Sequence, residues 1–371
     1  MIIKIIRALM PYGIYDFIHK RRNKNFFLDE FDKYISSNHD MKTYMTNSDV
    51  NENYKQIVSV QGLGYSGSGA ILDLLCEVDK CNVLGKDEKA IVLGNDHKGA
   101  FEVDFLRLAG GIFELEKYID SDNVFQNDAM ANRFISCVNA FPLFQKDKKV
   151  RDFFYAFFSS IIDLKISNVV GVPFNPYLYN NRDSSHIFFF KKMETPHFRH
   201  HCRILLMKLF SYLNTENKDI LVLDQFLQDN TLEIEKYKDY APSSRIILCY
   251  RDPRDVYQFA CDYNIGWIAH NDVNQFVKWY RQMTRNVNLN TNDYLVVQFE
   301  KLVFDYERQV ERILSYLNIN KEAHNPLLKL KFFNPNISKQ NIGLWKNNIK
   351  KQVDYEFIKE QLRIFCYFET N

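Results

Sequence analysis

A glycine-rich segment, GLGYSGSG at residues 62–69, holds the first residues whose types and spacing could do chemistry. It follows a short apolar run and precedes a stretch with helical periodicity, so strand, turn and helix are predicted in that order. Such a turn presents backbone N–H groups and a helix N-terminus to an anion. The hydroxyl groups of Ser66 and Ser68 add two donors. Because Ser68 stands where a Walker A loop has its lysine, the segment predicts a phosphate site of another kind, or a tight turn without a ligand.

A second candidate phosphate site lies in SRIILCYRDPRDVY, residues 244–257. The apolar run predicts a buried strand that ends at Arg251, and Pro253 is suited to the first turn of a helix. Arg251 and Arg254 would then lie at the carboxyl end of the strand, the edge where open α/β sheets bind ligands. A guanidinium there can hold a phosphate through two hydrogen bonds. Asp255, in the first helical turn, suits the helix dipole and could also orient an arginine.

Three segments resemble motifs of the sulfotransferases that use 3′-phosphoadenosine 5′-phosphosulfate (PAPS). RDPRDV at 251–256 resembles the 3′-phosphate-binding segment of that family, and GLGYSGSGAILDLL at 62–75 resembles its 5′-phosphosulfate loop. SKQNIGLWKN at 338–347 resembles its late G-x-W-K loop, which closes over the nucleotide. The segment between the second and third motifs, VVQFEKLVFDYERQVERIL, is also similar. The resemblance covers about residues 56–110 and 219–348.

This resemblance implies an enzyme that transfers a sulfuryl group from PAPS, as co-substrate, to a hydroxyl or amine of a glycan, with no metal required. The acceptor expected is a bacterial polysaccharide or a lipid-linked glycan. The resemblance places the sulfate donor on the glycine segment, at Gly64, Tyr65, Ser66, Gly67, Ser68 and Gly69. It places the 3′-phosphate on Arg251, Arg254, Lys339 and Gly343.

Two positions depart from the family's pattern. Tyr65 stands where many members carry a lysine or arginine beside the leaving phosphate. Phe259, eight residues after Arg251, stands where a serine commonly helps to bind the 3′-phosphate. Lys339, Lys346 or a residue of the insertion described below could supply the missing charge.

A general base would help to deprotonate the acceptor hydroxyl. The family uses a histidine or glutamate downstream of the phosphosulfate loop, and the candidates are Glu88, His97, Glu102 and Asp104. We favour Glu102, because it comes shortly before a Gly-Gly turn, as a glutamate does in similar members. A separate cluster, HFRHH at 197–201, has two histidines four residues apart, but no HExxH pattern follows. A structural or solvent-facing helix is the better prediction for it than a metal site.

The elements that must position these residues follow from the apolar pattern. Short, predominantly apolar runs at 57–60, 220–223, 246–249 and 295–297 alternate with helical patterns. This order predicts an α/β, P-loop-like three-layer fold with a central parallel sheet. Residues from about 105 to 215 form an aromatic-rich insertion that is mostly helical in pattern, as in RDFFYAFFSSIIDLKI.

The ends and the composition set the remaining expectations. Residues 1–24 form an amphipathic, basic segment, 25–55 a linker, and 56–371 the sulfotransferase-like domain. The first segment could lie on an anionic membrane surface or dock on its own domain. A net charge of +2 does not support binding to nucleic acid by charge, and seven scattered cysteines fit reduced thiols. We therefore expect a cytoplasmic protein, peripheral at most to the inner face of the membrane.

Two rival functions stay open. One is another P-loop enzyme such as a nucleotide kinase, against which the missing Walker lysine speaks. The other is a nucleotide-binding scaffold without catalysis, which the departures at Tyr65 and Phe259 would allow.

Overall fold

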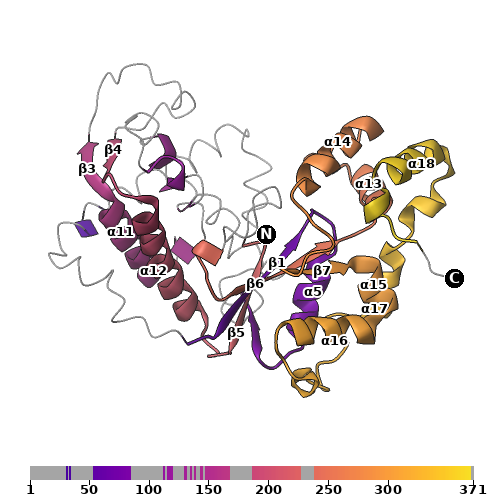
Figure 1. Ribbon diagram of the computed structural model, residues 1–371, viewed down its shortest axis with the longest axis horizontal. Coiled ribbons are helices and arrows are strands. Elements are labelled where there is room, and N and C mark those ends of the chain that lie inside the picture. The colour runs from indigo at the N-terminus through magenta and orange to yellow at the C-terminus, as the bar shows by residue number, and fades with distance from the viewer. Residues whose placement is uncertain are drawn as a thin grey trace, which may run out of the picture. The chain divides into compact units, whose positions relative to one another are not determined.

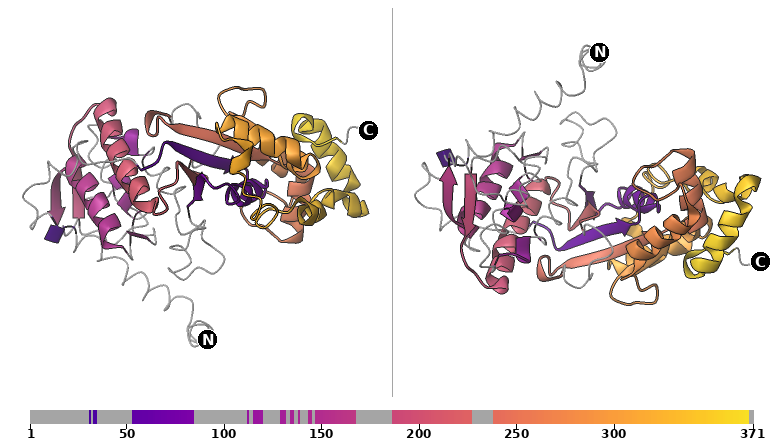
Figure 2. Two further views of the ribbon diagram at one scale, coloured as in Figure 1. Left: turned by 90° about the horizontal axis from the view of Figure 1, so that it is seen from below. Right: turned by 90° about the horizontal axis from the view of Figure 1, so that it is seen from above.

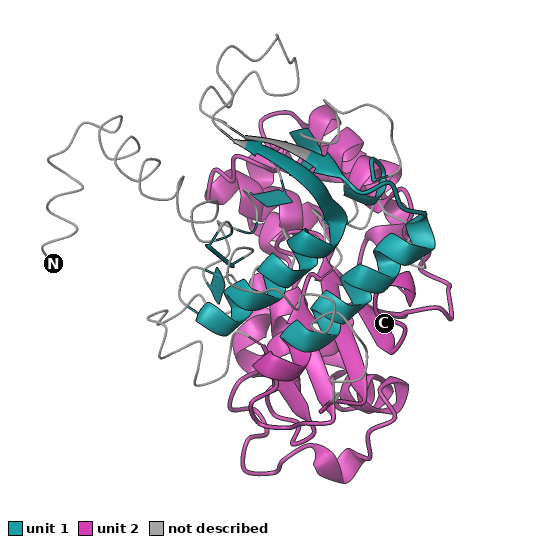
Figure 3. Cartoon of the chain, turned by 90° about the vertical axis from the view of Figure 1, so that its left-hand side faces the viewer, with its two compact units in different colours: residues 1–50, 111–209 teal, residues 51–110, 210–371 magenta. Residues whose placement is uncertain are grey.

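The computed structural model describes residues 53–84, 147–167, 186–226 and 238–368, together with 31, 33–34, 112, 115–119, 129–131, 134–135, 138 and 143–144. The chain divides into two compact units, which Figure 3 shows in different colours. One comprises residues 1–50 and 111–209, and the other residues 51–110 and 210–371. Within the described part of the chain, no helix is both long and apolar enough to cross a membrane.

The second unit is built on a five-stranded sheet in the order β2-β5-β1-β6-β7, and every neighbouring pair is parallel (Figure 1). Its strands are β1 (Gln56–Gly62), β2 (Cys81–Val83), β5 (Ile220–Asp224), β6 (Ser244–Tyr250) and β7 (Leu295–Gln298). The prediction of an α/β fold with a central parallel sheet is confirmed. The pattern had indicated all of these strands except β2.

Both faces of this sheet are buried. Alternate strand residues such as Val58, Val60 and Ile247 pack in one apolar cluster with helices α5 (Ser68–Leu75), α15 (Phe299–Phe304) and α16 (Tyr306–Tyr316). Intervening residues such as Leu221 and Leu248 are also buried, at 0% and 1% exposed. Burial on both sides explains why these strands read as continuous apolar runs in the sequence.

A second apolar cluster joins the helices that follow β6. It contains α13 (Pro253–Asp262), α14 (Val273–Thr284) and α18 (Gln352–Gln361), which Figure 2 shows near the C-terminus. The first two begin at aspartate N-caps, whose side chains accept from backbone N–H groups of the first turn. Helix α17 (Pro335–Ser338) and 3₁₀ turns at Lys321–Ala323, Lys339–Asn341, Leu344–Asn347, Ile349–Lys351 and Arg363–Phe365 complete this part.

The first unit contains helix α11 (Lys148–Ile161) and most of α12 (Thr195–Leu213). Between them lies an antiparallel hairpin of β3 (Ile162–Ser167) and β4 (His186–Phe190). The prediction of one helix through RDFFYAFFSSIIDLKI was therefore wrong in its last five residues. The cause is pairing with β4, about 20 residues further along the chain, which a local helical pattern does not reveal.

Strand register decides which segments meet at the carboxyl edge of the sheet. Gly62 at the end of β1 pairs with Cys249 of β6, and Tyr250 pairs with Gln298 at the end of β7. The turns after β1, β6 and β7 therefore leave the sheet at nearly the same level. The connection after β1 leads towards β2 on one side, and the connection after the neighbouring β6 leads towards β7 on the other. Such a reversal creates a ligand crevice in open α/β sheets.

Candidate functional site

The glycine turn between β1 and α5 is held in a specific conformation. Gly67 caps α5 with a φ of 90°, and Tyr65 has a φ of 60°, so both lie in the left-handed region. A Cβ atom on Gly67 would also lie 2.3 Å from Cδ2 of Phe299. Glycine is thus required at this position by both conformation and packing. No described side chain caps α5 and its first turn lacks an acidic residue, so its N-terminal N–H groups are suited to an anion.

Ser66 adds a buried hydroxyl group to this turn. The residue is 1% exposed, and its Oγ has no hydrogen-bond partner among the described residues. A Cβ on Gly62 would come within 2.3 Å of this Oγ, so the glycine makes room for it. The Cys249 thiol donates to the Ser66 carbonyl over 3.2 Å and fixes the backbone. An unsatisfied buried polar group costs about 1–3 kcal/mol. This hydroxyl is therefore suited to donate a hydrogen bond to an oxygen of a bound ligand.

Arg251 joins the glycine turn to the C-terminal loop. It follows the last residue of β6 and is 5% exposed. One terminal nitrogen donates to the Tyr65 carbonyl over 3.3 Å, and the other donates to the Asn341 carbonyl. Its Nε has no partner within the described part of the chain. The guanidinium lies 5.7 Å from the ring centroid of Phe299, next to the turn.

The surroundings of Arg251 are suited to an anionic ligand. Burial lowers the pKa of its guanidinium, while the nearby carboxylates of Asp255, Glu300 and Asp252 act in the opposite direction. Arginine stays protonated at neutral pH. A phosphate would therefore replace solvation that this cation has lost. The Nε–H, which has no partner among the described residues, is a donor for it.

Arg254 lies in a different setting from Arg251. Its guanidinium makes two hydrogen bonds to the Asp252 carboxylate, at 2.9 and 2.6 Å, and the pair is almost fully buried. It also lies 4.0 Å from the Trp345 ring centroid and donates to the Tyr367 carbonyl. Burial would lower its pKa, but the hydrogen bond and charge of Asp252 raise it. Its charge is thus neutralised within the fold, and the phosphate-binding role predicted for it would require this pair to open.

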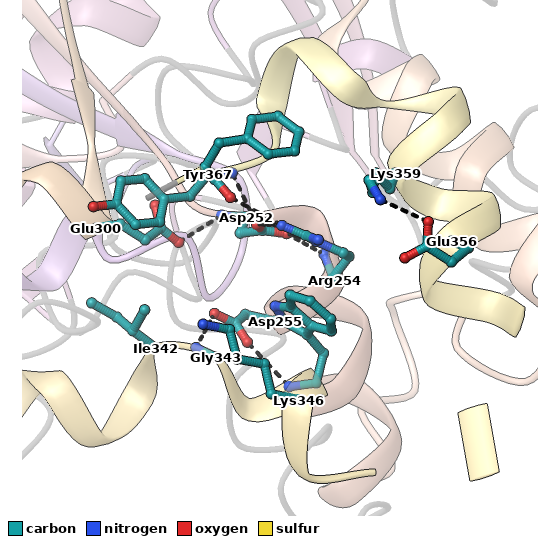
Figure 4. Close-up of a pocket in the computed structure, with 12 residues that line it drawn as sticks. Asp252, Arg254, Asp255, Glu300, Ile342, Gly343, Lys346, Glu356, Lys359 and Tyr367 are labelled. Carbon is teal, nitrogen blue, oxygen red and sulfur yellow. Dashed lines mark hydrogen bonds and ion pairs between the residues drawn. The ribbon is translucent and has the colours of Figure 1, made fainter. Parts of the chain in front are cut away.

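Asp255 holds the C-terminal loop against α13. Its carboxylate accepts from the Gly343 N–H over 2.8 Å and from the Trp345 N–H over 3.3 Å. Gly343 has a φ of 75°, which favours glycine. Figure 4 shows these contacts at the edge of a cavity of about 300 Å³. Lys339 is exposed, and its Nζ donates a hydrogen bond to the side-chain oxygen of Asn336 over 3.1 Å. The structure therefore brings Gly343 to the RDPRD segment, whereas the hydrogen bond of Lys339 to Asn336 stays within its own loop.

Glu300 is a buried carboxyl that the sequence indicated only as part of a family-like segment. It lies in the first turn of α15, the helix after β7, and its Oε1 accepts from the Asp252 N–H over 2.8 Å. Its Oε2 has no partner among the residues described. Burial, chiefly, raises the pKa of Glu300 to about 8. Below that pH it is a protonated, neutral carboxyl near Arg251, a placement visible only once the strand ends are in register.

The proposed base and several alternatives lie outside the described residues. These are Glu102, Glu88, His97 and Asp104. The three histidines of the HFRHH cluster are on α12, where burial lowers the pKa of His201. Among the described residues there is no group of three or more side chains able to hold a metal ion.

The chain is similar to solved sulfotransferase structures and, in part, to a family model. The chain is similar to the sulfotransferase domain of the Synechococcus PCC 7002 olefin synthase, with 13% identity over 87% of this chain and 98% of that one, and a TM-score of 0.36. It is similar to sulfotransferase STF9 from Mycobacterium avium, with 10% identity over 94% and 87% of the two chains, and a TM-score of 0.39. No curated protein sequence matches the chain.

A family model described as "Sulfotransferase family" matches residues 181–323. This stretch contains β5, β6 and β7, and with them Arg251, Arg254, Asp255 and Glu300. The part of the chain that is similar to this family model therefore includes the arginine side of the site.

Proposed function

We propose that this chain transfers a sulfuryl group from PAPS to a hydroxyl or amine of a glycan. The observation that supports the proposal most is a pair of buried donors without partners among the described residues, the Ser66 Oγ–H and the Arg251 Nε–H. They come from adjacent strand ends and are linked through the Tyr65 carbonyl. Two such donors beside an uncapped helix N-terminus are suited to a ligand with more than one anionic group.

The proposed reaction is a direct transfer between donor and acceptor. An acceptor oxygen or nitrogen forms a bond to sulfur while the bond from sulfur to the bridging phosphate oxygen breaks, and the electron pair of that bond leaves with adenosine 3′,5′-bisphosphate. The turn and Ser66 would hold the 5′-phosphosulfate, and Arg251 the 3′-phosphate. Positioning and charge stabilisation dominate such a transfer, as they do in phosphoryl transfer.

The acceptor proton requires a base, for which we propose Glu102. Glu102→Gln should lower turnover by about 10²–10⁴-fold, the usual effect of a positioned base. The affinity for adenosine 3′,5′-bisphosphate should stay unchanged, since the carboxylate would face the acceptor. Asp104→Asn is the matched control. If that variant loses turnover while Glu102→Gln keeps it, the base has been assigned to the wrong residue.

Nucleotide binding tests the proposal directly. Calorimetry with adenosine 3′,5′-bisphosphate should show a Kd about 10- to 100-fold higher for Arg251→Ala, because hydrogen bonds to charged groups contribute about 1.5–3 kcal/mol. Arg281→Ala is the control, because the Arg281 guanidinium donates a hydrogen bond to Gln361 at an exposed position. An unchanged Kd in Arg251→Ala would contradict the assignment of the 3′-phosphate site.

The same assay separates the rivals. A kinase should be stabilised by ATP with magnesium, whereas this proposal expects stabilisation by adenosine 3′,5′-bisphosphate without metal. A scaffold would bind the nucleotide but transfer nothing from labelled PAPS to a panel of glycans.

The membrane contact proposed for residues 1–24 lies outside the described residues. Deleting the segment should lower recovery with anionic vesicles and leave transfer to a water-soluble acceptor intact. Equal vesicle binding by the two forms would contradict this contact.

A further inference from the structure

Four aromatic rings form a connected group at the tip of the glycine turn. Tyr65 lies 4.7 Å from Phe259 and 5.7 Å from Trp267, and the second pair is stacked with an interplanar angle of 18°. Phe259 in turn lies 4.5 Å from Tyr263. The group joins the turn to helix α13 and to the segment that follows it. It also contains both positions at which the chain departs from the family's pattern, Tyr65 and Phe259, and these two rings are in contact.

Three of these rings face solvent. Tyr65 is 41% exposed, Trp267 55% and Tyr263 66%, while Phe259 is half-buried between its neighbours. A contiguous group of exposed rings on a soluble fold marks a binding surface more often than isolated exposed residues do. The surface lies beside the proposed donor site, so a ligand bound on it would lie close to the sulfuryl donor.

The backbone holds the rings in place. Tyr65 has a φ of 60°, which is unfavourable for a residue with a side chain. A Cβ on Gly64 would lie 1.5 Å from Cη2 of Trp267, so the indole rests directly on the glycine. Trp279 supports the same indole at 6.2 Å. Such strain is commonly associated with function.

We propose that Tyr65, Tyr263 and Trp267 form a platform on which a sugar ring of the acceptor stacks. The inference rests on the proposed function and names how that site holds its acceptor. At the two positions where the family binds its donor with polar groups, this chain has aromatic rings in contact. This end of the turn therefore presents an apolar face with polar tips, the two tyrosine hydroxyls and the indole N–H.

An open platform favours a sugar over a planar aromatic acceptor. Ring faces with polar tips can contact the apolar C–H face of a pyranose and bond its hydroxyls at the edge. A phenolic acceptor gains most from an enclosed apolar pocket that removes both of its faces from water. Three rings that are 41–66% exposed suit the first kind of ligand.

Tyr263→Ala is the sharpest test, because this ring contacts Phe259 and not the glycine turn. The assay is titration with N-acetylglucosamine and glucose oligosaccharides, in the presence of adenosine 3′,5′-bisphosphate. The oligosaccharide Kd should rise about three- to tenfold for the loss of one stacked ring. Tyr263→Phe should retain most of the affinity, and the nucleotide Kd should not change. Phe332→Ala, which removes a ring that is 48% exposed elsewhere, is the matched control.

A second variant tests whether the effect of Tyr263→Ala arises only from a local change in structure. Trp267→Phe keeps a ring over Gly64 but reduces the stacking area, and should weaken the same oligosaccharides more than it weakens the nucleotide. Unchanged oligosaccharide affinity in both variants would overturn the platform, as would wild-type protein that binds neither oligosaccharide. If the two variants lost sulfuryl transfer to p-nitrophenol but kept their affinity for the oligosaccharides, the choice of a sugar as the stacked ligand would be overturned. Failure of the wild type to bind the nucleotide would instead contradict the proposed function itself.

Discussion

Replacing Glu300 by glutamine should make the protein more stable at alkaline pH. The wild-type carboxyl is fully buried, with one oxygen bonded to the Asp252 N–H and the other without a partner among the described residues. Glutamine keeps an oxygen for that N–H but has no charge to bury. The variant therefore isolates the cost of ionising one carboxyl inside the fold.

The magnitude and sign follow from the pKa. Burial raises the pKa of Glu300 from its ordinary value near 4.5 to about 8. In this interval the unfolded chain has released the proton and the folded chain retains it, so the free energy of unfolding falls as pH rises. The contribution is fully present below about pH 4.5 and lost above about pH 8. At about 1.4 kcal/mol per pH unit, the loss is roughly 3 kcal/mol by pH 7 and roughly 5 kcal/mol at most.

Urea unfolding of both proteins from pH 5 to 9 would measure this effect. The difference in unfolding free energy between Glu300→Gln and wild type should be small at pH 5 and grow in favour of the variant up to pH 8. Glu356→Gln, which removes a carboxylate that is 59% exposed and paired with Lys359, is the control and should show no such trend. A difference that stays constant across the range would refute the reasoning.

Three further variants test other parts of the structure. Gly67→Ala should lower the free energy of unfolding by roughly 2–4 kcal/mol in urea, because it combines a left-handed φ with a clash against Phe299; an unchanged transition midpoint would contradict this. Asp255→Asn should accelerate amide hydrogen exchange in residues 339–347, which lose a charged acceptor, and equal protection would show that other contacts hold the loop. Glu77→Ala should cost about 3–5 kcal/mol in thermal unfolding, because a histidine and three backbone N–H groups share this buried carboxylate; a small shift would show that water replaces it.

Much of the fold could be predicted from the sequence because the relevant signals are local. The apolar runs that became β1, β5, β6 and β7 each lie within a few residues, and burial on both faces makes these strands predominantly apolar. Pro253 indicated the start of α13 for an equally local reason. The glycines at 62–69 predicted a strand–turn–helix because few other residues tolerate such a turn.

The hairpin of β3 and β4 could not be predicted in this way. Residues 162–166 continue an apolar pattern that fits a helix, and only pairing with residues 186–190 makes them a strand. The tertiary contact outweighs the local preference, because strand pairing depends on a partner that the local pattern does not contain.

The sequence by itself thus determined the order of the elements and brought both phosphate-binding candidates to the carboxyl ends of strands. Only the tertiary structure distinguished two arginines three residues apart. Arg254 is neutralised by Asp252, whereas the Nε–H of Arg251 has no partner among the described residues. Only it showed that Tyr65 and Phe259 are in contact. The physical reason is the same in each case. Charge balance and ring contacts depend on which strand ends share a level in the sheet, and register is set by packing across the whole core and not by any one segment.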